Sequence, residues 1–461
     1  MGVPDTLRRS PIDSLVRIHC PTYTTLRISL IVFVGNEVTK ERILRAELDF
    51  REGDTLVTTA LAGRLEANRR RLLNLQLFHS VLVQTVCRDG EITVLFSLQE
   101  RWYTFPIPIF SLADRNIRAW LDRPDRWQRV DYGVHVVRNN FRGRNEQLRG
   151  NLQLGFNQKY EVFFENPGTK RRPGLALGAS LARSRAVDYR TVQDQLLTYR
   201  SESGFAFHRT YFLAGLRWRN TVQRRTALDV AWRREQISDS IQIGNPSYFS
   251  GDQERRYIDV ALTRIINRRN NFSYPLTGRF AQITLSQRTF LHSASPSYAT
   301  LYARYARYIP LPHKLYYSAG LEGQTRLTNR RLAYADSRAL GYAALVRGYD
   351  RYVVDGQHYV LLQQGLTYPI LPARQLQLDA TNNPKFSTLP LAIYLNTFAD
   401  MGYVAAPASL ADAHNRLPNQ FLLAAGVGLH LVTYYDRVFA VEYALNALGQ
   451  TGLYIRTAFP I

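Results

Sequence analysis

Residues 102–461 contain no run with the three-to-four-residue apolar spacing of a helix. Strand-length runs alternate there with turn clusters such as Asn166-Pro167-Gly168 and Gly244-Asn245-Pro246. At about 22 residues for each strand with its loop, this length gives about sixteen strands. That is too many for one ordinary β-sandwich, so we expect a transmembrane antiparallel β-barrel.

Two runs of this region, Leu391–Gly402 and Val438–Leu445, alternate between an apolar and a more polar face. The second run carries on its apolar face Phe439, Val441, Tyr443 and Leu445. The first run carries on its more polar face Tyr394, Asn396, Phe398, Asp400 and Gly402. An apolar outer face with a polar inner face is typical of a membrane barrel. A soluble sandwich alternates in the same way with its apolar face inward, so periodicity alone leaves both open.

The composition agrees better with a membrane barrel than with helical spans. No stretch of 18 apolar residues exists, which excludes a transmembrane helix. The mean hydropathy of -0.26 would by itself indicate a soluble protein. However, 28 Tyr, 22 Phe and 5 Trp residues suit strands with aromatic girdles.

The chain is strongly basic, with a formal net charge of +22 that comes almost entirely from arginine. A basic chain raises nucleic acid as a partner. The arginines are scattered among aromatic residues, and there is no helix-turn-helix, zinc-finger or RNP pattern, so we expect no nucleic-acid binding. Two explanations stay open: a general preference for arginine in the source organism, and a surface that faces anionic lipid phosphates.

Residues 1–25 are predicted to be an irregular, basic leader without a recognisable secretory signal. If the protein is exported, this start is either truncated or mis-assigned. Cys20 and Cys87 are the only cysteines, and their positions imply neither a disulfide framework nor a metal site.

The segment after this leader has the order β-α-α-β-β. A β-rich run ends at Gly35-Asn36, Thr39 can N-cap a short helix, and Gly53-Asp54 separates it from a second helix. Two strand runs follow, joined by Arg88-Asp89-Gly90, in which Asp-Gly is a strong hairpin signal.

This module, residues 26–101, resembles a POTRA domain, with Gly35, Asn36, Thr39, Gly53 and Asp54 as its turn motif. The resemblance implies a periplasmic dock for polypeptides. An exposed strand edge would let an extended chain join its sheet. The simpler alternative is a generic α/β domain that acts as a plug or linker.

Two motifs of the second domain, residues 102–461, resemble the paired signature of the BamA/TamA superfamily, whose members carry a bacterial surface antigen-type barrel. The first motif is Val346-Arg347-Gly348-Tyr349 and the second is formed by Phe398, Asp400 and Gly402. The resemblance implies that the loop with Arg347 folds into the barrel and that Arg347 pairs with Asp400. A bidentate arginine–carboxylate pair fixes the relative orientation of its two partners in a way that lysine cannot. We therefore interpret the Arg347–Asp400 pair as a contact that fixes the register of the loop and the strand, rather than as a catalytic dyad.

The last strand, marked by Gly452, Tyr454 and Phe459, resembles a barrel-targeting strand, but the chain continues to Pro460-Ile461. In the superfamily the first and last strands pair weakly and open sideways. Pro106 and Pro108 lie in the predicted first strand and remove two hydrogen-bond donors. They suit such a gate, and equally they suit a simple link between the two domains.

The resemblance implies an outer-membrane factor that assembles and inserts β-barrel proteins, with the POTRA domain in the periplasm of a Gram-negative bacterium. Its partners would be unfolded outer-membrane clients, outer-membrane lipids including anionic lipopolysaccharide, and accessory lipoproteins. The alternatives are a secretion pore for one partner protein, which usually has two POTRA domains, and, more remotely, a soluble basic nucleic-acid-binding protein. No catalytic motif, metal-ligand spacing or cofactor motif is present, so we expect neither an enzyme nor a cofactor.

Overall fold

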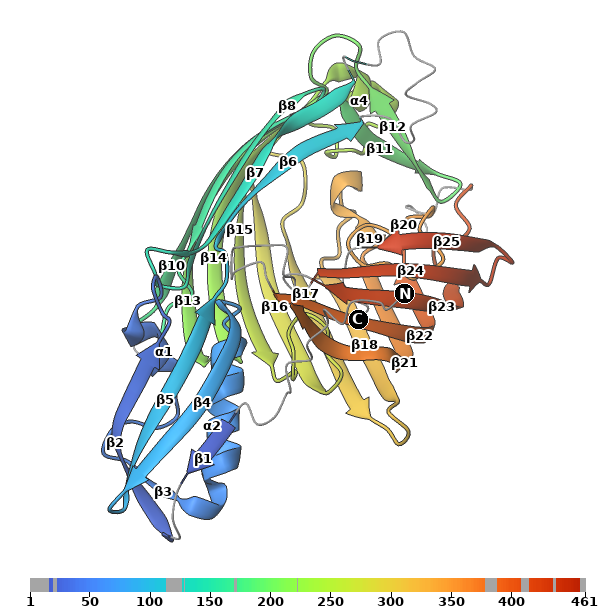
Figure 1. The fold of residues 1–461 in the computed structure, drawn as a ribbon. Helices are drawn as coiled ribbons and strands as arrows, with labels where there is room; N and C mark the ends of the chain where they lie inside the picture. The colour runs from blue at the N-terminus through green and yellow to red at the C-terminus, as the bar shows by residue number, and fades with distance from the viewer. Residues whose placement is uncertain are drawn as a thin grey trace.

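The computed structural model describes residues 16–19, 23–112, 127, 129–169, 172–221, 223–377, 388–407, 414–433 and 437–456. A small α/β domain at the N-terminus leads into one large, curved antiparallel sheet (Figure 1). None of the helices among these residues is long and apolar enough to cross a membrane.

The N-terminal domain is a five-stranded sheet in the order β1-β4-β5-β2-β3, packed against two helices. Its elements are β1 (Val16–His19), β2 (Thr25–Val34), α1 (Glu41–Glu47), β3 (Thr55–Val57), α2 (Thr58–Leu73), β4 (Phe78–Arg88) and β5 (Glu91–Glu100). The expected β-α-α-β-β order is present, with two short strands added at the sheet edges. Strands of three or four residues leave too few alternating positions to be predicted from periodicity.

One residue of this domain acts differently from the prediction. Thr39 does not cap α1, because the helix begins after Lys40 without any side-chain cap. Instead the Thr39 hydroxyl donates a hydrogen bond to the buried carboxylate of Glu100, at the end of β5. The capping role of Thr39 was predicted from the local sequence alone. Its actual partner, Glu100, lies 61 residues away in the chain and could not be identified in this way.

The β4–β5 hairpin turns at Asp89 and Gly90, which have φ values of 51° and 79°. These left-handed conformations are those of the turn predicted from Asp-Gly. Cys87, just before the turn, is disulfide-bonded. Our expectation that the cysteines imply no disulfide was therefore wrong. Cys20, the chain's only other cysteine, lies outside the described residues.

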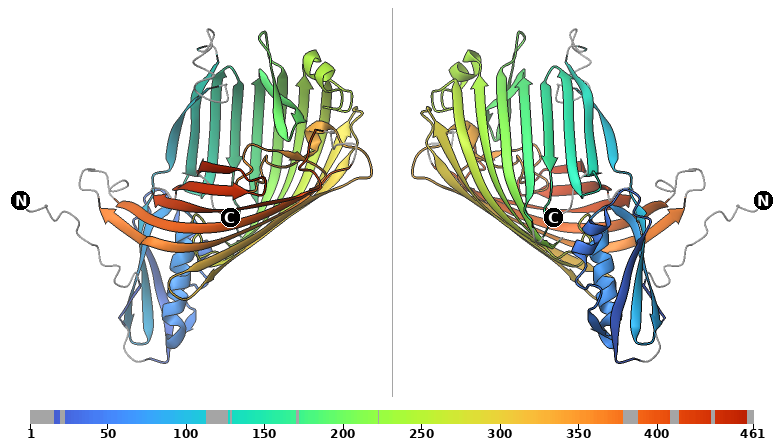
Figure 2. Two further views of the ribbon diagram at one scale, coloured as in Figure 1. Left: turned by 90° about the vertical axis from the view of Figure 1, so that its right-hand side faces the viewer. Right: turned by 90° about the vertical axis from the view of Figure 1, so that its left-hand side faces the viewer.

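The second domain is a sixteen-stranded antiparallel sheet, as the length predicted (Figures 1 and 2). Its strands, in sheet order, are β6 (Thr104–Leu112), β7 (Val130–Phe141), β8 (Glu146–Gly155), β9 (Gln158–Glu165), β10 (Gly174–Ser184), β13 (Phe207–Thr221), β14 (Arg224–Ile237), β15 (Glu254–Asn267), β16 (Gly278–Leu291), β17 (Tyr298–Pro310), β18 (Tyr316–Leu327), β21 (His358–Gln377), β22 (Thr388–Ala405), β23 (Phe421–Thr433), β24 (Arg437–Asn446) and β25 (Thr451–Arg456).

The sheet presents apolar side chains outward and more polar ones inward. In β24, Phe439, Val441, Tyr443 and Leu445 are 42–50% exposed, whereas Glu442 between them is 2% exposed. The inward row of β22 is buried and contains Asn396, Phe398 and Asp400. This inside-out pattern is that of a barrel with lipid around it.

Several short elements occur in the connections between the long strands, at the end of the sheet away from the N-terminal domain (Figure 1). They are β11 (Ala186–Val192), β12 (Gln195–Arg200), α4 (Asp239–Gly244), η2 (Tyr334–Asp336), β19 (Arg338–Leu340) and β20 (Val354–Asp355).

The two ends of the large sheet are β6 and β25, which pair with β7 and β24 but not with each other among the described residues. Figure 1 shows them on opposite sides of the opening of the curved sheet. Pro106 and Pro108 lie in β6. Proline is tolerated there because an end strand needs hydrogen bonds on one side only.

Candidate functional site

The connection between β18 and β21, residues 328–357, forms an interior loop. Its part from Gly341 to Val353 packs against the inner faces of β21 to β24. Its buried residues Val346 and Tyr349, both 3% exposed or less, belong to one apolar cluster with side chains of β21, β22 and β23. That cluster contains Ala339, Leu340, Ala344, Val346, Tyr349, Val354, Leu361, Val404, Leu417, Leu422 and Ala424. The loop is therefore a packed part of the interior.

Arg347 makes a bidentate ion pair with Asp400 of β22. Its Nε lies 2.8 Å from Asp400 Oδ2 and its Nη2 lies 2.6 Å from Oδ1. The backbone N–H of Arg347 donates to the same Oδ2 over 3.1 Å, so both the side chain and the backbone of the loop are held. Both side chains are at most 4% exposed. Water is excluded, which strengthens the electrostatic attraction between them.

Further interior groups surround this pair. The Arg347 guanidinium stacks on the Phe398 ring, with its carbon 3.9 Å from the ring centroid. Glu442 of β24 places Oε1 3.5 Å from Arg347 Nη1 and Oε2 2.9 Å from Arg456 Nε. Arg456 of β25 also contacts Asp350 of the loop over 2.7 Å. The network thus joins the loop to β22, β24 and the last strand of the sheet.

Two glycines allow the loop to approach this closely. Gly348 has φ +91°, and a Cβ there would stand 3.3 Å from the Cβ atoms of Ala424 and Ala444. Its carbonyl accepts a hydrogen bond from Asn446 Nδ2 over 2.9 Å. At Gly402 a Cβ would come within 2.5 Å of a Val346 methyl group. A larger residue is therefore disfavoured at Gly348 by the backbone conformation and by packing, and at Gly402 by packing alone.

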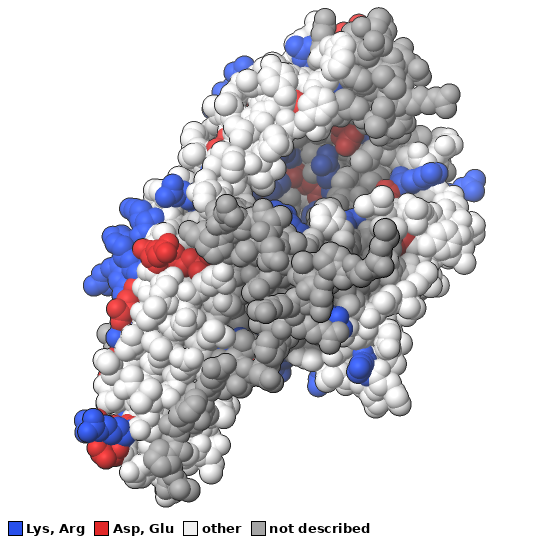
Figure 3. Space-filling model, in the orientation of Figure 1, with Lys and Arg blue, Asp and Glu red and all other residues white. Residues whose placement is uncertain are grey.

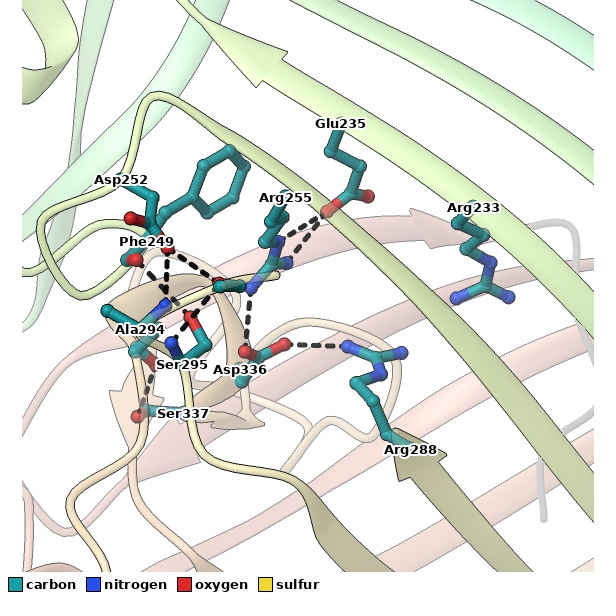
Figure 4. Close-up of polar contacts among 12 residues, drawn as sticks. Arg233, Glu235, Phe249, Asp252, Arg255, Arg288, Ala294, Ser295, Asp336 and Ser337 are labelled. Carbon is teal, nitrogen blue, oxygen red and sulfur yellow. Dashed lines mark hydrogen bonds and ion pairs between the residues drawn. The ribbon is translucent and has the colours of Figure 1, made fainter. Parts of the chain in front are cut away.

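A second ion-pair network, which the sequence did not indicate, holds the other end of the same loop (Figure 4). Asp336 of η2 accepts from Arg255 of β15 over 2.7 Å and from Arg288 of β16 over 2.6 Å. Arg255 also pairs with Glu235 of β14, and Arg288 with Asp259 of β15. The Asp336 side chain is 1% exposed. The loop therefore crosses the interior between two anchors, one on β14–β16 and one on β22–β25.

The N-terminal turn motif lies at a separate place, in the domain itself and at its junction with the sheet. Gly35 has φ +87° and lies against the Leu98 carbonyl, while Asn36 donates to the Thr39 carbonyl. Gly53 and Asp54 form the turn before β3 and exchange backbone hydrogen bonds with Ile28.

Thr39 is part of the junction between the two domains. Its hydroxyl accepts a hydrogen bond from Asn140 of the large sheet over 2.8 Å and lies 3.2 Å from the Tyr103 hydroxyl. Burial raises the pKa of Tyr103. Glu47 of α1 forms a buried ion pair of 2.7 Å with Arg219 of β13. These long-range partners left no local signal in the sequence.

The predicted C-terminal strand marker is described only in part. Gly452 and Tyr454 lie in β25, and a Cβ at Gly452 would collide with the Tyr454 ring. Phe459 lies outside the described residues.

Two family models match the chain. One, the Omp85 superfamily domain, matches residues 140–361. The other, a POTRA model described as a surface antigen variable number repeat, matches residues 26–101. No curated protein matches the sequence significantly.

Solved structures of similar fold cover 94% of the chain at low sequence identity. A crystal structure of BamA from Haemophilus ducreyi lacking POTRA domains 1–3 has 15% identity and a TM-score of 0.52, with 83% of that chain covered. CdiB from Acinetobacter baumannii has 15% identity and a TM-score of 0.50, and CdiB from Escherichia coli has 12% and 0.51. In both CdiB chains 74% of the length is covered. At such identities the likeness concerns the fold.

Proposed function

We propose that the chain is an Omp85-superfamily protein, as its matches to the Omp85 and POTRA family models indicate, and that it assembles and inserts β-barrel proteins in the bacterial outer membrane. In this proposal the POTRA domain faces the periplasm and receives unfolded client chains, and the edge of the large sheet templates their insertion. The predicted role of Arg347 is to hold the interior loop and the last strands in register.

The observation that carries the proposal is the pair of free edges. β6 and β25 end the sixteen-stranded sheet without pairing to each other among the described residues. An unpaired strand edge is a template for a further strand, and in lipid the unsatisfied backbone groups strongly favour such pairing. A client strand that pairs with either edge would satisfy these groups.

The packing of the interior favours a sideways route over passage along the axis. The β11–β12 hairpin contacts the anchored loop, where the Val353 N–H donates to the Asp194 carbonyl and Thr191 donates to Asp355. The Asp194 carboxylate accepts the backbone N–H groups of Arg416 and Leu417. Three separate loops are thereby joined across one end of the interior. Axial transport would have to break these buried contacts.

The POTRA domain offers an edge for an extended chain. Among the described residues, β1 pairs only with Val83–Val86 of the longer strand β4. The remaining length of that edge could accept a further strand by β-augmentation.

Site-specific photocrosslinking during client insertion tests the proposal. Purified protein in liposomes would carry a benzophenone amino acid at Phe110 of β6, which is 68% exposed, or at Ile455 of β25, which is 76% exposed. We expect crosslinks to a urea-denatured barrel client at both positions, together with its insertion into the liposomes. Phe212 of β13, 51% exposed and also facing outward, is the matched control and should give none.

Equal crosslinking at Phe110 and Phe212 would contradict the proposal that client strands pair with the edge strands of the sheet. The alternative, a secretion pore for one partner protein, predicts a different outcome. A partner would then cross the membrane of the same liposomes, and crosslinks would arise from interior positions such as Arg149.

A further inference from the structure

The outer face of the first strands contains a charged residue in an apolar row. Tyr132 of β7, Leu152 of β8 and Val162 of β9 point outward and are 53%, 46% and 56% exposed. Arg138 of β7 faces the same way as Tyr132, six residues along the strand. It stands opposite Leu148, which in turn stands opposite Phe164. A guanidinium is too costly to leave in hydrocarbon, so this row marks the boundary of the apolar band.

Beyond this row the surface becomes basic and aromatic. Arg142, in the β7–β8 turn, places its guanidinium carbon 5.3 Å from the Phe141 ring centroid and 5.6 Å from that of Phe164. It also pairs with the buried carboxylate of Glu146 while its side chain stays 50% exposed. An amphipathic arginine above aromatic rings is typical of a membrane–water interface.

The POTRA domain adds two more cations at the same place. The Lys40 backbone N–H donates to the Gly143 carbonyl over 2.9 Å, which fixes the start of α1 beside the β7–β8 turn. Lys40 and Arg42 are both exposed. Within the described residues, no carboxylate forms an ion pair with Lys40, Arg42 or Arg138. Figure 3 shows several lysine and arginine side chains at the edge of the molecule where the POTRA domain meets the large sheet, with acidic side chains beside them.

We infer that Lys40, Arg42, Arg138 and Arg142, the junction patch, bind the headgroups of anionic phospholipids in the leaflet on the POTRA side. This inference rests on the membrane location in the proposed function. Basic residues at such a boundary attract anionic headgroups. The patch continues an outward apolar band and lies on aromatic rings, which suits a lipid surface better than an acidic protein.

Such binding would position the POTRA domain. Two of the four cations belong to that domain and two to the sheet, so one lipid surface would contact both. The start of α1 would then lie at the level of the headgroups. Because the chain passes directly from β5 into β6, the POTRA domain, which receives the client in the proposed function, would be held close to the free edge of the sheet.

Lipid retention by the full chain tests the inference. The protein would be reconstituted into nanodiscs of phosphatidylethanolamine and phosphatidylglycerol at 3:1, and the lipids kept after gentle detergent extraction would be counted by native mass spectrometry. We expect the double variant Arg42→Gln/Arg138→Gln to retain about threefold less phosphatidylglycerol than the wild type. Arg42→Lys/Arg138→Lys keeps the charge and should retain it.

Arg27→Gln/Arg88→Gln is the matched control, because it removes two exposed charges from the far end of the POTRA domain. Equal retention by the Arg42/Arg138 glutamine variant and the wild type would overturn the inference and favour an acidic protein partner. An equal loss in the control would overturn it too. Client insertion is measured separately, so loss of lipid retention with insertion intact leaves the junction patch supported.

Discussion

At the scale of single residues, the Arg347–Asp400 pair is the contact whose loss should cost most. Removing Arg347 leaves the buried Asp400 carboxylate without its counterion, and removing Asp400 leaves Arg347 only the longer contact with Glu442. Breaking such a buried pair costs about 3–5 kcal/mol. We expect Arg347→Ala and Asp400→Ala each to lower the free energy of unfolding in detergent by about that amount and to impair client insertion. The double variant should cost less than the sum, since it leaves neither of these two charges unpaired.

Urea titration followed by heat-dependent gel migration measures these effects. Arg351→Ala, an exposed arginine four residues along the same loop, is the control and should change the free energy of unfolding by less than about 0.5 kcal/mol. Wild-type stability and activity in both single variants would remove the proposed role of the pair.

Gly348 allows a second prediction at this scale. Alanine there would adopt a left-handed φ and would crowd Ala424 and Ala444. We expect Gly348→Ala to lower the free energy of unfolding by about 1–3 kcal/mol. Gly449 has φ +74° and no atom within 4 Å of the place that a Cβ would take, so Gly449→Ala carries the backbone strain alone. An equal cost for both substitutions would show that packing at Gly348 contributes nothing.

At the scale of elements, the anchored loop should depend on both of its ends. Asp336→Asn removes the charge shared by Arg255 and Arg288 while Glu235 and Asp259 stay in place. We expect the loop to open more often, and trypsin to cleave after the exposed Arg330 about tenfold faster. Mass spectrometry of the native digest measures this rate.

Asp252→Asn is the matched control for this prediction. Asp252, drawn in the same close-up, accepts hydrogen bonds from Ser293 and the Ala294 backbone, which lie outside the anchored loop. The same cleavage rate in the Asp336 variant and the wild type would show that the second anchor does not hold the loop.

The elements also show what the sequence could and could not indicate. Alternation in Leu391–Gly402 correctly placed Phe398 and Asp400 on the inner face, because a two-residue period survives wherever one face is buried. The hairpin at Asp89-Gly90 was predictable because its chemistry is local. Alternation in Val438–Leu445 likewise put Glu442 on the face opposite Phe439, where it is buried. Its ion-pair partners, and Asp336 with its own partners, were missed because these contacts join segments far apart in the chain.

At the scale of the whole molecule, the two domains meet through buried polar contacts. Buried polar contacts hold the POTRA domain in one orientation relative to the large sheet. The same number of exposed contacts would permit the two domains to move about a hinge. Glu47–Arg219 is the ion pair on which this orientation should depend, because both side chains are less than 10% exposed. Arg219 Nε also donates to the Gly168 carbonyl, so the pair is tied to a turn of the sheet.

We therefore predict that Glu47→Gln loosens the POTRA domain while both domains stay folded. Spin labels at Val57→Cys in β3 and Lys314→Cys in the β17–β18 turn, both exposed, would report their separation by pulsed electron paramagnetic resonance. One narrow distance distribution is expected for the parent protein, and a distribution at least about twice as wide for Glu47→Gln. Glu66→Gln, which removes a partner of Arg69 and Arg70 on α2 away from the junction, should leave the width unchanged. If Glu47→Gln also leaves the width of the distance distribution unchanged, the hydrogen bonds around Thr39 suffice to fix the POTRA domain. The Glu47–Arg219 ion pair would then not be the contact that holds the POTRA domain beside the free edge of β6.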